Sequence, residues 1–210
     1  MERADITPAV EAERLRIADV LDDLAPEEWA VPSLCGGWTV KVVVAHLTLA
    51  TRLSPFGAVR GVIAARGDIN RMIDRASRAR ATQYSPAELV AQLRENAGSA
   101  RRPFGAKPMD PLVDVLVHGQ DISRPLHRTL PMPVETVVPT LEFVVSASFY
   151  GAPERLAGLR LVATDVDRSF TDGGREVRGP VGELLLVATG RSAGLAALSG
   201  DGVDELAGRL

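Results

Sequence analysis

The sequence predicts a mainly α-helical protein, with a helical bundle over residues 1–152 and a small α+β region over residues 153–210. Two patterns support this division. Up to about Pro153 apolar residues recur at helical spacing, whereas the later segments are short, partly alternating and separated by turn residues. Of the 210 residues, 46% are hydrophobic and 24% are charged, so the chain can bury a sizeable core.

The expected helices of the first region have recognisable starts and ends. Thr7-Pro8 opens the first helix, and Ser85-Pro86-Ala87-Glu88 has the cap, proline and glutamate positions of a capping box. Asp110-Pro111 begins a later helix, with Asp110 as its N-cap, and Pro125 prevents that helix from continuing. The expected helices cover residues 7–24, 39–53, 56–80, 85–96, 110–123 and 133–148.

The C-terminal region is expected to contain three short strands and one good helix. Leu159–Thr164 alternates like a half-buried strand. Two further strands are expected at Arg168–Thr171 and Glu176–Arg178, with a hairpin turn at Asp172-Gly173-Gly174 between them. Gly179-Pro180 then opens a helix over residues 181–189, and two short helical pieces follow.

Composition excludes several classes of protein. The net charge of −3 and the acidic pI argue against a protein that binds nucleic acid by general electrostatics. No apolar run approaches the roughly 20 residues that span a bilayer, and the polar N-terminus is unlike a secretory signal. The single cysteine permits no internal disulfide. We therefore expect a cytoplasmic protein without a nucleic-acid or membrane partner. A monomer and a homodimer are both compatible with the sequence.

A candidate metal site is the most informative feature. Asp114 and His118 lie four residues apart on the helix over residues 110–123, so both side chains lie on one face, and only apolar residues separate them. Burying such groups without partners is costly, and a shared metal ion satisfies both. His46 lies in the middle of the helix that Thr39 can cap and is a third candidate ligand. Two His and one carboxylate are a common ligand set for an open catalytic site.

Other interpretations of these polar residues remain open. Asp114 and His118 can form a simple ion pair. Asp121 can form a hydrogen bond with a metal-binding side chain on the side away from the metal, or it can pair with Arg124 near the helix end. Cys35 is expected to be a buried structural thiol rather than a nucleophile, because no His lies near it in the sequence.

Two tryptophans and a row of arginines are also assigned structural roles. Trp29 and Trp38 are expected to be core anchors of the loop before the second helix. The arginines between residues 60 and 80 are expected to form a solvated helix face, with attraction of an anionic substrate or thiol cofactor as the alternative.

Several segments together resemble a known family. They are Trp29, Ser33-Leu34-Cys35-Gly36-Gly37-Trp38-Thr39-Val40, Val44-Ala45-His46-Leu47, Asp114-x-x-x-His118-Gly119-Gln120-Asp121 and, near the C-terminus, Gly179–Leu186 with Gly190-Arg191. This pattern resembles the DinB-like four-helix-bundle metalloproteins, and more narrowly the mycothiol-dependent maleylpyruvate isomerase family of actinobacteria. The resemblance extends over nearly the whole chain.

The resemblance implies a DinB-like four-helix bundle that holds a divalent metal, usually zinc, through His46, Asp114 and His118. One departure concerns the acidic ligand, because the isomerase subgroup has Glu where this chain has Asp114. Aspartate is one methylene shorter, so the metal must lie closer to this helix or the carboxylate must bind it differently.

The resemblance also implies a metal-dependent thiol transferase or isomerase, with mycothiol as co-substrate and a small electrophilic substrate. Arg191 is the candidate for binding a negative charge on that substrate, with a structural salt bridge as the alternative. We expect the C-terminal region to pack over the open end of the bundle, because a small sheet is barely stable alone. The competing functions are a non-catalytic metal-binding or regulatory protein and a metal-dependent hydrolase with Asp121 as general base.

Overall fold

The structure is a computed structural model that describes residues 3–52, 55–103 and 105–210. These residues divide into two compact units, an N-terminal unit up to Leu130 and a C-terminal unit from Pro131 to Leu210. Helices predominate, and the described residues contain one small three-stranded sheet, which confirms the predicted mainly-α fold class. Within the described ranges, no helix is long and apolar enough to cross a membrane.

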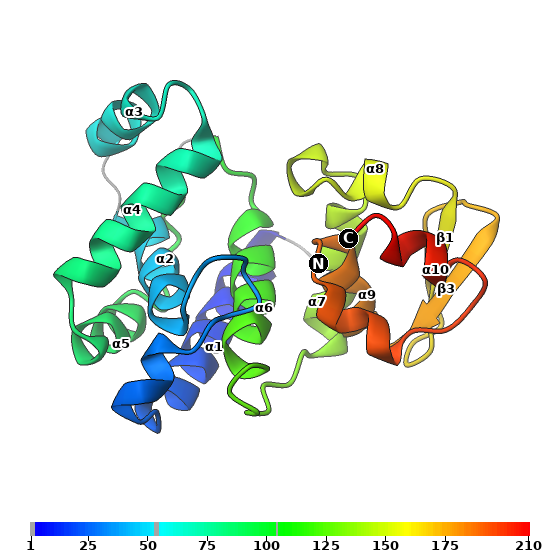
Figure 1. The fold of residues 1–210 in the computed structure, drawn as a ribbon, viewed down its shortest axis with the longest axis horizontal. Coiled ribbons are helices and arrows are strands. Elements are labelled where there is room, and N and C mark those ends of the chain that lie inside the picture. Colours follow the sequence, from blue (N-terminus) through cyan, green and yellow to red (C-terminus); the bar gives the residue numbers. More distant parts are fainter. Residues whose placement is uncertain (1–2, 53–54, 104) are drawn as a thin grey trace. The chain divides into compact units, whose positions relative to one another are not determined.

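The N-terminal unit is helical throughout and is coloured blue to green in Figure 1. Helix α2 lies at its centre and contacts α4, α5 and α6, while α1 contacts α5 and α6. The apolar sequence of α2 suits this central position. Residues 42–45 are all buried, and Leu47 is 2% exposed. The elements of this unit are α1 (Arg3–Asp22), η1 (Pro26–Ala30), α2 (Val40–Arg52), α3 (Pro55–Ala64), α4 (Ile69–Gln83), α5 (Pro86–Glu95) and α6 (Asp110–Ser123).

The helix expected over residues 56–80 is two helices, and the prediction of one continuous helix is wrong. The chain breaks between α3 and α4 at Arg66 and Gly67, which both have positive φ values, 57° and 83°. Asp68 then caps α4, its side chain accepting a hydrogen bond from the backbone N–H of Arg71 (3.0 Å). Helical periodicity continues across this break, which is why the pattern alone did not reveal it.

Helix starts were predicted at Thr7-Pro8, at Ser85 and at Asp110. The first prediction is wrong, because α1 begins at Arg3 and contains Pro8 within the helix. The capping box at the start of α5 is confirmed, with Ser85 accepting from the Glu88 backbone and Glu88 from the Ser85 backbone. Asp110, in contrast, is the first residue of α6 rather than its N-cap, which is Met109. The Asp110 carboxylate accepts the backbone N–H of Lys107 (2.7 Å) and so fixes the preceding turn.

The C-terminal unit surrounds one apolar helix, α9 (Val181–Ala188). This helix contacts α7 (Val134–Val144) as well as strands β1 (Leu159–Ala163) and β3 (Arg175–Gly179). Residues 184–188 of α9 are all buried, as expected for a helix covered on more than one side. The remaining elements are η2 (Ser148–Tyr150), α8 (Ala152–Arg155), β2 (Ser169–Phe170), η3 (Ser192–Ala197) and α10 (Val203–Ala207).

All three predicted strands are present, but the predicted hairpin is not. The strand order is β2-β1-β3, with β1 antiparallel to β2 and parallel to β3. Residues 172–174 therefore connect the two edge strands across the start of β1. A Cβ atom on Gly173 would lie 2.3 Å from backbone atoms of Gly158 and Leu159, so this crossing requires glycine.

Helix α7 belongs to the C-terminal unit because it packs on α9. The sequence-based division at residue 152 follows the change from long helices to strands, whereas the compact units separate before α7. The long helices thus give way to strands near residue 152, whereas the packing divides between Leu130 and Pro131.

Candidate metal centre

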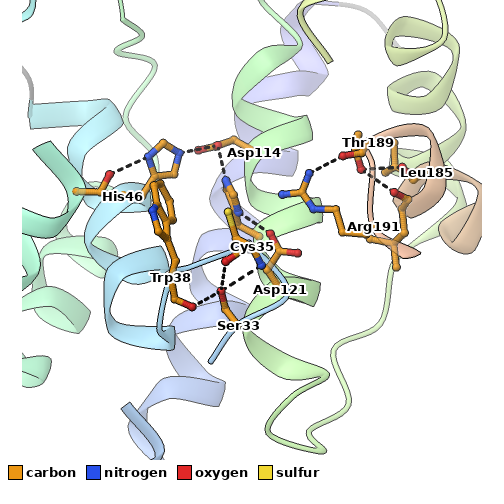
Figure 2. A network of polar contacts seen from close by, with 12 residues as sticks. Ser33, Cys35, Trp38, His46, Asp114, Asp121, Leu185, Thr189 and Arg191 are labelled. Atoms are coloured by element: carbon orange, nitrogen blue, oxygen red, sulfur yellow. Dashed lines mark hydrogen bonds and ion pairs between the residues drawn. The ribbon is translucent and has the colours of Figure 1, made fainter. Parts of the chain in front are cut away.

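The side chains of His46, Asp114 and His118 converge within the N-terminal unit. Asp114 Oδ1 lies 3.1 Å from His46 Nε2 and 3.4 Å from His118 Nε2. One ligand atom from each of the three residues lies within 4.8 Å of the others. Helix α2 supplies His46, and one face of α6 supplies the other two, as their spacing predicted. Figure 2 shows His46 and Asp114 pointing toward each other.

Buried hydrogen-bond partners lie behind both imidazole rings. His118 Nδ1 lies 2.8 Å from Oδ2 of the fully buried Asp121. When Nδ1 carries the proton and donates it to this carboxylate, the Nε2 lone pair is free to bind a cation. His46 Nδ1 has a weaker partner, the hydroxyl of buried Ser77 on α4, at 3.4 Å. Both rings thus direct Nε2 toward Asp114.

The charges around Asp114 favour its ionised form. Burial raises the pKa of Asp114, but the neighbouring His46, His118 and Arg14 lower it by more than burial raises it. The resulting pKa is about 2, below the ordinary value of 3.8. The His46 contribution is both a charge interaction and a hydrogen bond. Arg14 is itself 3% exposed and is held by the backbone carbonyls of residues 96, 97 and 99, at 2.9–3.1 Å. The cluster therefore contains a carboxylate that remains ionised at neutral pH.

Trp38 covers the two imidazole rings. Its ring centroid lies 5.3 Å from that of His46 and 6.3 Å from that of His118, with an angle of 24° between the planes of Trp38 and His118. The two imidazoles meet edge to face at 5.0 Å. Trp29 and Trp38 are 7% and 9% exposed, which confirms the expectation that both are buried anchors.

Cys35 lies closer to this cluster than its sequence context suggested. It is half-buried rather than fully buried, and its sulfur forms a second group with His118 and Asp121 in which ligand atoms lie within 4.8 Å. The loop turns here because Ser33 Oγ donates to the Trp38 carbonyl and accepts the Cys35 N–H, as drawn in Figure 2. The sequence argument that no His lies nearby therefore holds along the chain but not in space.

Arg191 lies in the C-terminal unit, just after α9. Gly190, with φ of 87°, ends this helix, and the Arg191 backbone N–H donates to the Leu186 carbonyl (2.8 Å). The Arg191 guanidinium is half-buried and donates to the carbonyl of Thr189 (2.7 Å), a contact visible in Figure 2. The expected helix end at Gly190 is thus confirmed, while binding of a substrate charge by Arg191 stays a prediction.

Sequence reasoning missed three of the neighbours of this cluster. Ser77 and Asp74, which accepts a hydrogen bond from the Trp38 indole, come from α4, which the pattern indicated only as an arginine-rich surface helix. Arg14 comes from α1. None of them has a local signal, because each acts through a contact between helices far apart in the sequence. Asp121 was left between two roles, and its Oδ2 lies 2.8 Å from His118 Nδ1, as the supporting role requires.

The donor set suits a divalent cation that accepts nitrogen and oxygen ligands. Two neutral imidazoles and one carboxylate are a known set for zinc, with a position left open for a further ligand. The buried carboxylate behind His118 is the kind of partner that metal-binding histidines have. The fold and the cluster together define a class, a mainly helical protein with a candidate His₂-carboxylate metal centre on two bundle helices.

Comparison with known proteins identifies the family. Residues 10–120 match the sequence model of the Mycothiol maleylpyruvate isomerase N-terminal domain, a range that includes His46, Asp114 and His118. The chain belongs to this family. No curated protein matches it. Two similar solved structures are those of the mycothiol-dependent maleylpyruvate isomerase and of a histidine-to-alanine mutant of it. Each superposes with a TM-score of 0.61 and is 13% identical in sequence. The aligned region covers 96% of this chain and 93% of the isomerase chain.

Proposed function

We propose that His46, Asp114 and His118 bind a divalent metal ion, with zinc as the first candidate. The observation that carries this proposal is that both Nε2 atoms face the same Asp114 oxygen, at 3.1 and 3.4 Å. Tetrahedral ligands about 2.0–2.1 Å from zinc are themselves about 3.3 Å apart. The shorter aspartate side chain is therefore long enough for the three ligand atoms to approach one another.

We further propose that the protein is a thiol-dependent transferase or isomerase that uses mycothiol as co-substrate. Family membership supports this, since the matching domain and the similar structures carry the words mycothiol and maleylpyruvate isomerase in their names. A divalent ion with three protein ligands keeps a position open and lowers the pKa of a thiol that binds there. The proposed substrate is a small electrophile, and the thiol sulfur would add to its electrophilic carbon.

The residues of this chain would orient the reactants and control their charge. Asp121 keeps His118 in the tautomer with a free Nε2, and Asp114 supplies the negative charge of the ligand set. Arg191 is the candidate for a carboxylate of the substrate, because its guanidinium remains charged at all relevant pH values. No protein nucleophile is needed, so Cys35 has no covalent role in this scheme.

A hydrolase is less well supported. Asp121, the candidate general base, is fully buried and its Oδ2 lies against His118 Nδ1, so it is engaged in orienting the ring. A base that activates water needs access to that water.

The proposed function is tested by assaying metal-loaded protein with mycothiol. Maleylpyruvate tests isomerisation, and chlorodinitrobenzene and bromobimane test thiol transfer to general electrophiles. We expect turnover that requires both the metal and the thiol and that is lost in His46→Ala. Protein that binds metal tightly but turns over none of these substrates would support the non-catalytic alternative instead.

A further inference from the structure

Trp38 is tied to helix α4 through the polar edge of its indole ring. Its Nε1–H donates to Asp74 Oδ1 at 2.7 Å. The same oxygen accepts a hydrogen bond from Arg78 Nε at 2.8 Å, and Arg78 also donates to the carbonyl of Gly37 at 2.9 Å. Arg78 thus holds Asp74 from one side and the residue before Trp38 from the other.

This connection is maintained by charge as well as by packing. The hydrogen bond from Trp38 is the main cause of a lowered pKa at Asp74, with burial acting in the opposite direction and Arg78 and Arg75 lowering the pKa further. Asp74 therefore accepts as a carboxylate at neutral pH, and a charged acceptor makes a stronger hydrogen bond than a neutral one. The hydrogen bond to Asp74 thus restricts the orientation of the indole in addition to the packing around it.

The two imidazole rings differ in how strongly the rest of the protein holds them. The Nδ1 atom of His118 has a short hydrogen bond to buried Asp121 (2.8 Å), whereas the Nδ1 atom of His46 lies 3.4 Å from the Ser77 hydroxyl. The Trp38 ring lies closer to His46 than to His118, at 5.3 Å against 6.3 Å. Contact with Trp38 therefore constrains the plane of His46 in addition to the contacts of its two nitrogens with Ser77 and Asp114.

We propose that Trp38, held by Asp74 and Arg78, is a positioning residue that fixes the imidazole planes with both Nε2 atoms toward Asp114. This inference rests on the proposed metal centre and goes beyond it, since it assigns to residues outside the ligand set the task of orienting the ligands before an ion binds. Partners of this kind alter metal affinity by about 10–100-fold when they are removed.

Two variants separate ring orientation from bulk packing. Trp38→Phe keeps an aromatic ring but loses the N–H that reaches Asp74, and Asp74→Ala keeps the indole but loses its acceptor. Trp29→Phe is the matched control for loss of a buried tryptophan, and Asp19→Ala is the control for loss of a carboxylate paired with arginine at the surface. Asp74→Asn restores a side-chain oxygen that can accept from Trp38.

The first measurement is the zinc dissociation constant by chelator competition, at a temperature well below the unfolding midpoint of every variant. We expect Trp38→Phe and Asp74→Ala to bind zinc about 10–100-fold more weakly than the wild type, Asp74→Asn to recover most of the loss, and both controls to bind like the wild type. Equal zinc affinity in wild type, Trp38→Phe and Asp74→Ala overturns the inference, even where their melting temperatures differ.

The second measurement needs no metal and keeps the inference separate from the proposed function. Imidazole ¹⁵N–¹H spectra of metal-free protein report the tautomer of each histidine. We expect a single tautomer of His46 in the wild type and a mixture in Asp74→Ala, with His118 unchanged. An unchanged His46 spectrum contradicts the positioning role. A wild-type protein with this ordered His46 that fails to bind zinc contradicts the metal proposal alone.

Discussion

The Nδ1 atom of His118 lies 2.8 Å from Oδ2 of Asp121, whose side chain is fully buried. This contact determines which ring nitrogen can face Asp114, one turn earlier on α6. The two acidic residues of this helix therefore have different tasks. Asp114 is half-buried and lies between the two imidazoles, and Asp121 lies behind one of them.

Replacing Asp121 with Asn tests the orienting contact. The amide is of similar size, but it carries no charge and is a weaker acceptor for the His118 N–H. We expect zinc affinity to fall by about 10–100-fold with the helix intact. Chelator competition measures the affinity, and far-ultraviolet circular dichroism checks the fold. Unchanged affinity in Asp121→Asn would mean that the tautomer of His118 is set by other groups.

The acid stability of the metal-free protein should depend on Asp114. Its pKa in the folded state is about 2, below the ordinary value of 3.8, so its ionised form stabilises the fold above about pH 4. This stabilisation, roughly 2 kcal/mol, is lost as the pH falls from about 4 toward 2. Urea unfolding with chelator present should show that the stability difference between wild type and Asp114→Asn shrinks over this range. A difference that is constant between pH 5 and 2 would contradict the assigned pKa.

Gly173 should be essential for the small sheet. A Cβ at this position would meet backbone atoms at 2.3 Å, which cannot move aside as a side chain can. We expect Gly173→Ala to destabilise the protein by about 2–4 kcal/mol. Gly174→Ala is the matched control, because no atom lies within 4 Å of its Cβ position. Equal melting temperatures for the two variants would show that residues 172–174 do not cross β1 as described.

Arg191→Ala tests the candidate for substrate binding. We expect a higher KM for an anionic substrate, by about tenfold or more, with the zinc content unchanged, because a charge-assisted hydrogen bond to the substrate is lost. Arg168→Ala, which removes an exposed arginine of the same unit, should leave KM unchanged. Wild-type kinetics in Arg191→Ala would assign Arg191 a structural role, such as its contact with the Thr189 carbonyl, in place of substrate binding.

Those parts of the fold that depend on local pattern could be predicted from the sequence. The capping box at Ser85 and the helix end at Gly190 follow from residues that lie within a few positions of one another. The shared face of Asp114 and His118 is also local, since it needs only a helix. His46 was a candidate from its place in an apolar helix, and only the family motif connected it with Asp114 and His118, because nothing in the spacing along the chain connects α2 with α6.

The remaining features depend on contacts between distant segments. The break between α3 and α4 occurs at Arg66 and Gly67, and Asp68 caps the next helix, but helical periodicity on both sides concealed this local signal. The parallel pairing of β1 with β3 was missed because Asp172-Gly173-Gly174 has the composition of a hairpin turn. No local pattern marks Arg14 or Asp74, and only the packing of α1 and α4 against their neighbours reveals their partners.

The central claim is that His46, Asp114 and His118 bind one metal ion. The most direct test is the zinc stoichiometry and affinity of purified protein, measured by isothermal titration calorimetry for the wild type and for His46→Ala, Asp114→Ala and His118→Ala. We predict about one ion per chain in the wild type and a loss of at least 100-fold in affinity in each variant. A wild type that binds no divalent ion, or three variants that bind it as tightly as the wild type, would contradict this account.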